Sequence, residues 1–203
     1  MIRERLTDEA RAHWSDIDWQ LVANEEGSVE GAAVYWVPDL RDLGLESGER
    51  LGAWRAALNQ NQERPARDVA LYADISTLIA FDYIIANADR WSGGNIKGNA
   101  SRDRVVVRDH NLAFAVPMAA SRLNRITTSL ERVERFSRAF VVRLQRLSRP
   151  SLQRELMPDA GGDRSPLLDE EEFRAMWDRV QTVRSYVGSL VDQYGTDRVL
   201  AFP

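Results

Sequence analysis

Four polar residues in the middle of the chain have the types and spacing that phosphoryl transfer uses. Asp89 and Arg90 follow a long apolar segment, Asn95 comes shortly after them, and Asp109 follows two short strand-like segments. Phosphoryl transfer needs a carboxylate that orients the attacking hydroxyl, and oxygen ligands that hold a divalent cation against the phosphates. Asp89 suits the first role, Asn95 and Asp109 suit the second, and the planar fork of Arg90 can brace the loop.

The proximity of these residues depends on the elements around them. Residues 68–87 carry apolar side chains at helical spacing, so we predict a helix that ends just before the Asp-Arg pair. Residues 95–98 and 104–108 are predicted to form a β-hairpin. Because a hairpin returns its far end to its start, Asp109 is expected near Asn95, where a carboxylate and an amide can share a hard cation.

Each residue also has an explanation that needs no chemistry. Taken alone, Asp89 is typical of a helix-capping or salt-bridged loop aspartate, and Asn95 is typical of a turn residue after two glycines. Asp109 is typical of a strand-end carboxylate that pairs with Arg104 or Arg108. The combination, with each residue after a suitable element, is what favours phosphoryl transfer.

A resemblance to a known superfamily is carried by two segments, FDYIIANADRWSGGN at residues 81–95 and VVVRDHNLAF at residues 105–114. They resemble the catalytic loop and the metal-binding segment of the atypical kinases, which include phosphatidylinositol kinases, HipA-type kinases and the four-jointed and Golgi casein kinases. The resemblance implies that Asp89 is the catalytic aspartate. It implies that Asn95 and Asp109 bind the metal.

The same resemblance implies that the chain transfers the γ-phosphate of ATP, with Mg²⁺ or Mn²⁺, to a hydroxyl-bearing protein or small-molecule acceptor. The region from residue 81 to residue 114 that contains both segments covers about a sixth of the chain, and the sequence departs from the family pattern in several places. Trp91 stands where histidine is common, the interval from Asp89 to Asn95 is one residue longer than usual, and His110 begins an unusual pair. No glycine-rich loop is present, and the only lysine, Lys97, follows the catalytic loop.

These features predict an α+β fold, mainly helical: a kinase-like C-lobe with a short β-hairpin after the catalytic loop and a reduced or missing N-lobe. Residues 1–66 are predicted as an N-terminal segment, in which the apolar run at 32–37 forms a hinge-like strand closed by Pro38. Residues 67–203 are predicted as the helical C-lobe-like domain. An upstream segment or a partner protein is expected to supply what the N-lobe lacks.

Four further segments are predicted to be helical from their apolar spacing and capping residues. They are residues 6–14, residues 51–58, a segment beyond Pro117 with one apolar stripe of Val133, Phe136, Phe140, Leu144 and Leu147, and residues 169–194, capped by Asp169 and Glu172.

Composition excludes several classes of function. The 203 residues are 44% hydrophobic and include no cysteine, so a packed core is expected while disulfides and thiolate metal sites are excluded. The net charge of −4 argues against nucleic acid as a partner. The sequence contains no apolar stretch of about 18 residues, so no membrane span is predicted. A cytoplasmic location is therefore expected. Nine arginines between residues 122 and 154 are interpreted as a solvated helix face, with an acidic substrate as the alternative.

Three hypotheses for function follow. The first is an atypical kinase, or the C-lobe of one, in which Asp89 orients the hydroxyl, Arg90 braces the loop, and Asn95 and Asp109 hold the metal. The second is a kinase-like binding or regulatory module without catalysis, which the missing phosphate lysine favours. The third is a helical scaffold with a chance motif.

Overall fold

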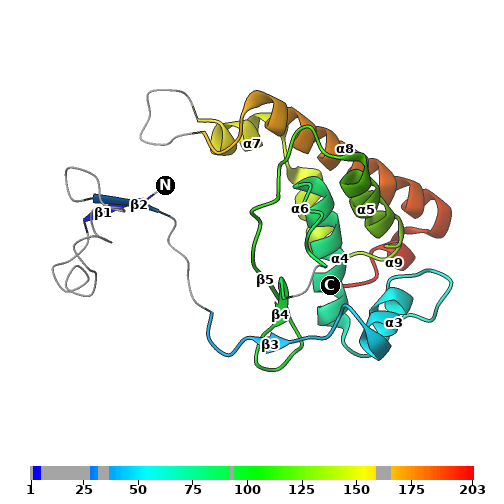
Figure 1. Cartoon of the computed structure of the whole chain (residues 1–203). Coiled ribbons are helices and arrows are strands. Elements are labelled where there is room, and N and C mark those ends of the chain that lie inside the picture. Colours follow the sequence, from blue (N-terminus) through cyan, green and yellow to red (C-terminus); the bar gives the residue numbers. More distant parts are fainter. Residues whose placement is uncertain (1, 6–27, 32–36, 92–93, 159–165) are drawn as a thin grey trace. The chain divides into compact units, whose positions relative to one another are not determined.

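The computed structural model describes residues 2–5, 28–31, 37–91, 94–158 and 166–203, and it divides the chain into two compact units, residues 1–38 and 39–203 (Figure 1). In the smaller unit, β1 (Ile2–Arg5) pairs antiparallel with β2 (Ser28–Gly31), with Ile2 opposite Gly31. The helix predicted at residues 6–14 and all of the predicted strand except Val37 lie outside the described residues.

The larger unit contains the remaining described elements and is an α+β fold in which helices predominate. In chain order these are β3 (Arg41–Asp42), α3 (Gly48–Ala57), α4 (Val69–Ile84), β4 (Ile96–Gly98), β5 (Val105–Val107), α5 (Ala120–Glu131), α6 (Arg138–Arg146), α7 (Arg149–Leu156), α8 (Glu170–Tyr194) and α9 (Thr196–Val199). The fold class predicted from the sequence is confirmed at this level, while the kinase-like C-lobe stays a prediction. Among the described helices none is both long and apolar enough to cross a bilayer.

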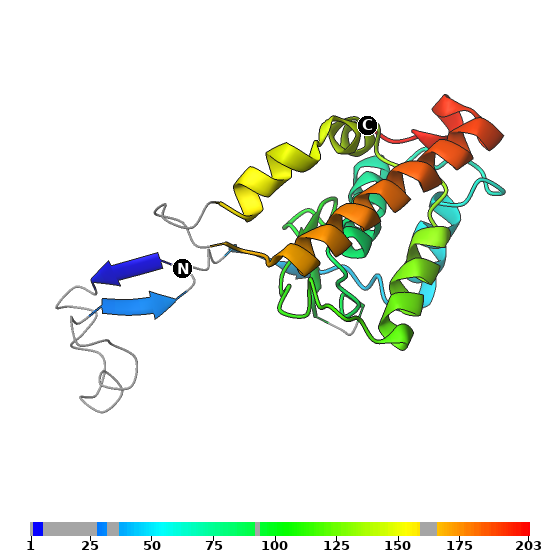
Figure 2. The same cartoon turned by 90° about the horizontal axis from the view of Figure 1, so that it is seen from above.

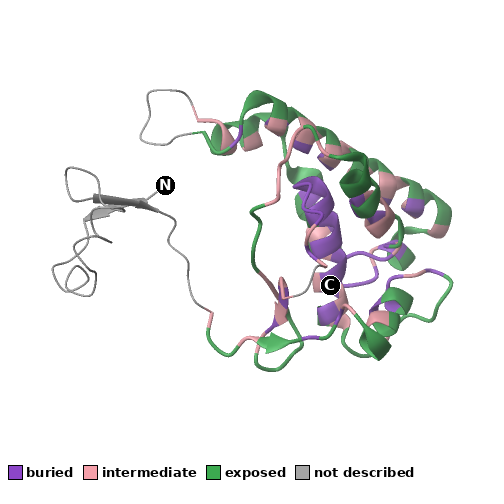
Figure 3. Cartoon of the chain, viewed as in Figure 1, coloured by how far each residue is buried: buried purple, intermediate pink, exposed green. Residues whose placement is uncertain are grey.

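Helix α4 is the central element of this unit. It is buried along most of its length (Figure 3), as expected for a helix whose sequence is apolar nearly all round. Helices α5 and α8 both pack against it. The helix predicted at residues 68–87 is therefore confirmed, and it ends at Ile84. Its C-terminal end delivers the chain to the loop that carries Asp89.

The predicted hairpin is confirmed, and a third strand extends it. Strand β4 lies between β3 and β5 in an antiparallel sheet, with Arg41 opposite Gly98 and Lys97 opposite Val106. Gly98 lies against the Leu43 side chain, and a Cβ atom at this position would overlap the Leu43 Cδ2 atom. A larger residue at this position would require the Leu43 side chain to move.

The prediction that the apolar stripe beyond Pro117 lies on one helix is wrong. Helix α5 ends at Glu131, and α6 begins only at Arg138. Between them Val133 and Phe136 are fully buried in a non-helical stretch, where the Phe136 amide donates to the Val199 carbonyl at 2.7 Å. Backbone bonds to a distant segment replace the helical ones here, although the apolar spacing is that of a helix.

The long C-terminal helix is confirmed with its cap. Helix α8 begins after Asp169, whose carboxylate accepts from the Glu172 amide at 2.8 Å, while the Glu172 carboxylate accepts from the Asp169 amide at 2.9 Å. Figure 2 shows α8 running across the larger unit, with α9 at its end. The predicted helix at residues 51–58 is also present, as α3. Residues 39–66 thus pack within the larger unit, and the predicted boundary at residue 66 stays a prediction.

Candidate functional site

The loop that carries Asp89 starts with a sharp change of direction at the end of α4. Ala86 has a φ of 60°, and the Asn87 amide donates to the Asp82 carbonyl at 2.8 Å. Nearby, Phe114 has a φ of 61° and its amide donates to the Ile85 carbonyl at 2.6 Å. The chain segment that follows the hairpin therefore returns to the point where the loop begins. Left-handed backbone at residues other than glycine is costly, and it concentrates at functional sites.

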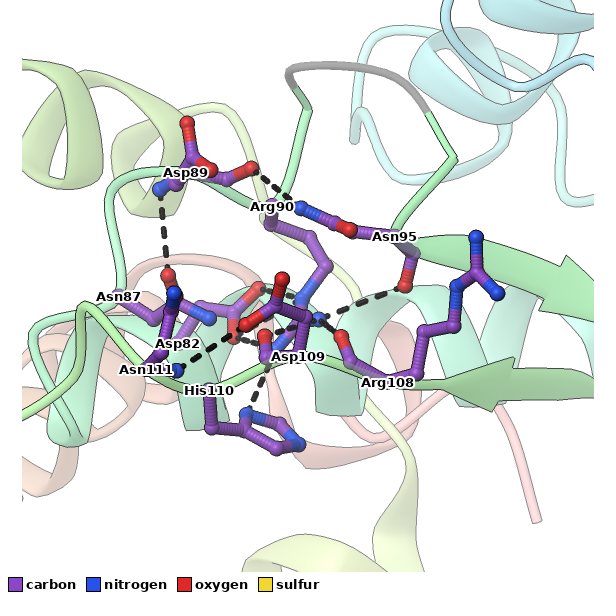
Figure 4. Close-up of polar contacts among 9 residues, drawn as sticks. All are labelled: Asp82, Asn87, Asp89, Arg90, Asn95, Arg108, Asp109, His110 and Asn111. Atoms are coloured by element: carbon purple, nitrogen blue, oxygen red, sulfur yellow. Dashed lines mark hydrogen bonds and ion pairs between the residues drawn. The ribbon is translucent and has the colours of Figure 1, made fainter. Parts of the chain in front are cut away.

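Arg90 is the centre of the site, and its side chain is 1% exposed. Its guanidinium forms an ion pair with Asp82 of α4, with nitrogen–oxygen distances of 2.9 to 3.2 Å. The Nη1 atom donates to the carbonyls of Arg108 at 2.6 Å, Asp109 at 3.3 Å and Asn95 at 3.4 Å (Figure 4). One buried cation thus joins the central helix, the loop and both ends of the hairpin.

His110 also contacts the Arg90 guanidinium. Its Nδ1 atom lies 2.9 Å from Nη2 of Arg90. Because a guanidinium only donates hydrogen bonds, Nδ1 must accept, which leaves the proton of the neutral ring on Nε2. Partial burial, and then the positive charge of Arg90, lower the pKa of His110, so the neutral ring is favoured.

The acidic partner of the pair is buried as well. Asp82 is 4% exposed, and burial raises the pKa of its carboxyl against the opposing effect of the Arg90 guanidinium. A buried ion pair of this kind is weak evidence for stability, but losing one partner leaves an uncompensated charge. The pair therefore makes the loop geometry depend on both residues at once.

Asp89 and Asn95 are brought into direct contact by the loop. The Asn95 Nδ2 atom donates to the Asp89 carbonyl at 3.2 Å, and the Asp89 amide donates to the Asn87 Oδ1 atom, also at 3.2 Å. Asp89 is half-buried. The bond from Asn95 uses the nitrogen of its amide, which leaves the amide oxygen for a cation.

Asp109 is exposed at the far end of the hairpin and has a φ of 60°, a conformation that aspartate tolerates better than most residues. Its Oδ1 atom accepts from the Asn111 amide at 3.2 Å. The alternative pairing partners are engaged elsewhere: Arg104 pairs with Asp74 at 2.7 Å, and the Arg108 Nε atom donates to the Gly94 carbonyl at 2.9 Å. The strand-end pairing with Arg104 that the sequence left open is not formed.

Asn95 and Asp109 have the residue types that can bind a cation shared with a substrate. Within the described part of the chain, no group of three His, Cys, Asp or Glu side chains could hold a metal by itself. Asn95 and Asp109 each carry a side-chain oxygen, and their backbone carbonyls both accept from Nη1 of Arg90. Mg²⁺ at phosphotransfer sites is commonly held by one or two carboxylates with substrate phosphates and water. An amide and a carboxylate are the hard oxygen donors that such a cation prefers.

Two contributors were not predicted from the sequence. Asp82 was assigned no role, although it is the only charged residue in the apolar run 75–88, and a lone charge in such a run signals a buried partner. His110 was also assigned no role. Its contact with Arg90 depends on where the chain turns after β5, for which the sequence carries no short signal.

Comparison with protein families, with curated proteins and with solved structures finds no match to this chain.

Proposed function

We propose that residues 39–203 act as the catalytic lobe of an atypical kinase, transferring the γ-phosphate of ATP to a hydroxyl acceptor with Mg²⁺ or Mn²⁺. The observation that carries the proposal is the set of contacts of Arg90, because it bonds to the backbone of both Asn95 and Asp109 and directly follows Asp89. A chance motif has no need for a buried charge that gathers these three residues.

In the proposed reaction the acceptor oxygen bonds to the γ-phosphorus, and the bond from that phosphorus to the bridging oxygen breaks to release ADP. Asp89 orients the acceptor hydroxyl and accepts its proton. Asn95 and Asp109 hold the metal, which when bound neutralises charge on the phosphates. Arg90 is a positioning residue, because its guanidinium is occupied by Asp82, His110 and backbone carbonyls.

A kinase-like binding module is the second candidate, and the position of Lys97 favours it. This single lysine lies in β4, after the catalytic loop, so the chain has no lysine upstream to contact nucleotide phosphates. If the first proposal holds, another segment or a partner protein supplies that contact. ATP should then bind weakly to residues 1–203.

The deciding experiment is thermal unfolding with and without Mg²⁺ and ATP. We expect a stabilisation of only about 0.4 kcal/mol when ATP is at its dissociation constant, rising with concentration. Asp109→Asn should abolish this response, since asparagine tolerates the backbone of Asp109 but lacks its charge. The exposed Asp192 of α8 provides the matched control, and Asp192→Asn should respond as the parent does.

Phosphate transfer is then followed as autophosphorylation, which should be slow or absent for residues 1–203 alone. Where another segment or a partner protein restores it, Asp89→Asn should remove it while leaving the Mg-ATP response in place. A parent chain that gains no stability from Mg-ATP at any concentration would favour the binding module. An equal response in Asp109→Asn and the parent would remove Asp109 from the metal site.

A further inference from the structure

A pocket in the larger unit lies beside the loop that carries Asp89, and none of the residue roles proposed above involves it. It is formed between α3, α4 and α5, and has a volume of about 170 Å³. Leu51, Trp54, Ile79 and Trp91 form its apolar wall. The rings of Trp54 and Trp91 stack with centroids 5.2 Å apart and planes at 21°, and the Trp54 Nε1 atom donates to the Leu45 carbonyl at 2.9 Å. The wall is therefore held in place before any ligand binds.

The polar part of the pocket is positively charged. Arg55, Arg125 and Arg132 line it, and Glu46 is the acidic residue among its lining side chains. The Arg125 Nη1 atom donates to the Ala88 carbonyl at 3.2 Å, which ties α5 to the residue before Asp89. An excess of guanidinium groups beside an apolar wall is complementary to an anion that carries an apolar portion.

The inner end of the pocket reaches the catalytic loop. A second hollow of about 10 Å³, the size of one water molecule, is lined by four residues of the pocket and also by Asn87 and Ala88. Asn87 is 3% exposed, and its Nδ2 atom has no hydrogen-bond partner among the described residues. A buried donor without a partner is costly, so an acceptor atom from a ligand or a water is expected there.

The same asparagine connects the pocket to the chemistry. Its Oδ1 atom accepts from the Asp89 amide, and Trp91 of the pocket wall lies two residues beyond Asp89. Residues on both sides of Asp89 thus line the two hollows. A ligand in the pocket lies against the loop that holds the catalytic carboxylate.

We infer that this pocket binds a small anionic molecule with a flat apolar portion. The assignment of that molecule as the phosphoryl acceptor rests on the proposed function. At about 170 Å³ the pocket is smaller than the roughly 300–1,000 Å³ of sites that enclose drug-sized ligands, so it suits a compact acceptor better than a nucleotide.

Titration calorimetry with phenyl phosphate, without metal or nucleotide, tests the inference. We expect the parent chain to bind it, and Arg132→Gln to weaken binding by about tenfold through loss of a charge-assisted contact. Arg122 is an exposed arginine of α5, the helix that ends just before Arg132, and it does not line the pocket, so Arg122→Gln should bind within about twofold of the parent. Phenol and inorganic phosphate should each bind about tenfold more weakly than phenyl phosphate, since each retains half of the recognised chemistry.

Several results would overturn the inference. They are the absence of binding to the parent at about 10 mM phenyl phosphate, equal affinity in Arg132→Gln and the parent, and equal affinity for phenol or for inorganic phosphate. Displacement of phenyl phosphate by ATP at the same site would make the pocket a nucleotide site and refute the acceptor assignment. Because these titrations contain no ATP until that last step, they succeed or fail independently of the Asp109→Asn experiment.

Discussion

The loop around Arg90 and the helix α8 each contribute buried side chains to the larger unit, but they are stabilised by different interactions. The loop is held by one guanidinium that bonds to a carboxylate, an imidazole and three carbonyls. Helix α8 instead buries an apolar face made of Phe173, Met176, Val180, Val183, Val187 and Leu190. In the loop, the conformation depends on one side chain. In α8, many apolar contacts each contribute a small part of the stability.

Substitutions in these two regions should therefore have different effects. Loss of an apolar side chain from α8 costs free energy in proportion to the contacts and cavity volume involved, and it leaves no charge behind. Loss of the Arg90 guanidinium leaves Asp82 as an unpaired charge, and it leaves the backbone carbonyls that Arg90 contacted without a donor. A substitution in the loop should therefore affect stability and the site together, while one in α8 should affect stability alone.

The largest effect is expected for Arg90→Met, which keeps the apolar volume and removes the charge. We expect the free energy of unfolding to fall by about 3–5 kcal/mol, because Asp82 is left buried without a partner. Urea denaturation measures the loss. The double variant Asp82→Leu/Arg90→Met should recover much of the stability but still show no response to Mg-ATP. A double variant that is no more stable than Arg90→Met would show that the ion pair is not what the single substitution disrupts.

A comparable or smaller loss is expected for Leu190→Ala in α8. The side chain is 7% exposed, and its truncation should cost about 2–5 kcal/mol by the same denaturation measurement. The Mg-ATP response of the folded fraction should remain that of the parent. Leu123 of α5 is 45% exposed, so Leu123→Ala provides a control that should change stability by less than about 0.5 kcal/mol. Loss of the ligand response in Leu190→Ala would break the separation between the two regions.

The smallest effect concerns pH and distinguishes the polar region from the apolar one. Because the pKa of His110 is lowered in the folded state, the unfolded chain binds more protons at this residue as pH falls below about 6.5. Its contribution is fully present above that pH and is lost as pH falls toward the folded pKa. The residue is exposed, so the change should be small. His110→Gln should flatten the dependence of the melting temperature between pH 5 and 7, whereas Leu190→Ala should preserve its shape. An unchanged pH profile in His110→Gln would show that His110 does not carry this pH dependence.

Much of the fold near the site was predictable, because the signals there are local. The helical period of residues 68–87 and the β-branched run that precedes Asp109 predicted α4 and the hairpin, and the capping pair predicted the start of α8. The two-residue strand β3 is too short to carry a pattern. The stretch 132–137 was misassigned because its long-range backbone bonds go to Leu58 and to residues near 200, and a helical spacing cannot reveal partners so far along the chain.

In the candidate site, too, the features with local sequence signals were predictable and one that depends on a tertiary contact was not. The proximity of Asp89, Asn95 and Asp109 was expected from the hairpin alone, and the structure joins the first two by a hydrogen bond and the last two through Arg90. The bracing role of Arg90 was also anticipated, but its partner was not. Asp82 lies in α4, before the loop begins. It could have been identified from the sequence only by taking a single charged residue in an apolar helix as evidence for a buried ion pair.

The contacts of Arg90 also have a consequence for the order of folding. Its side-chain partners lie between 5 and 20 residues away in the sequence, whereas Gln60, which anchors the last residues of the unit, bonds to Arg198 at a separation of 138. The entropy lost on closing a chain segment grows with the logarithm of its length, so the shorter closure costs about 2 kcal/mol less. We therefore expect the loop and hairpin to assemble early, while the two ends of the larger unit are still apart.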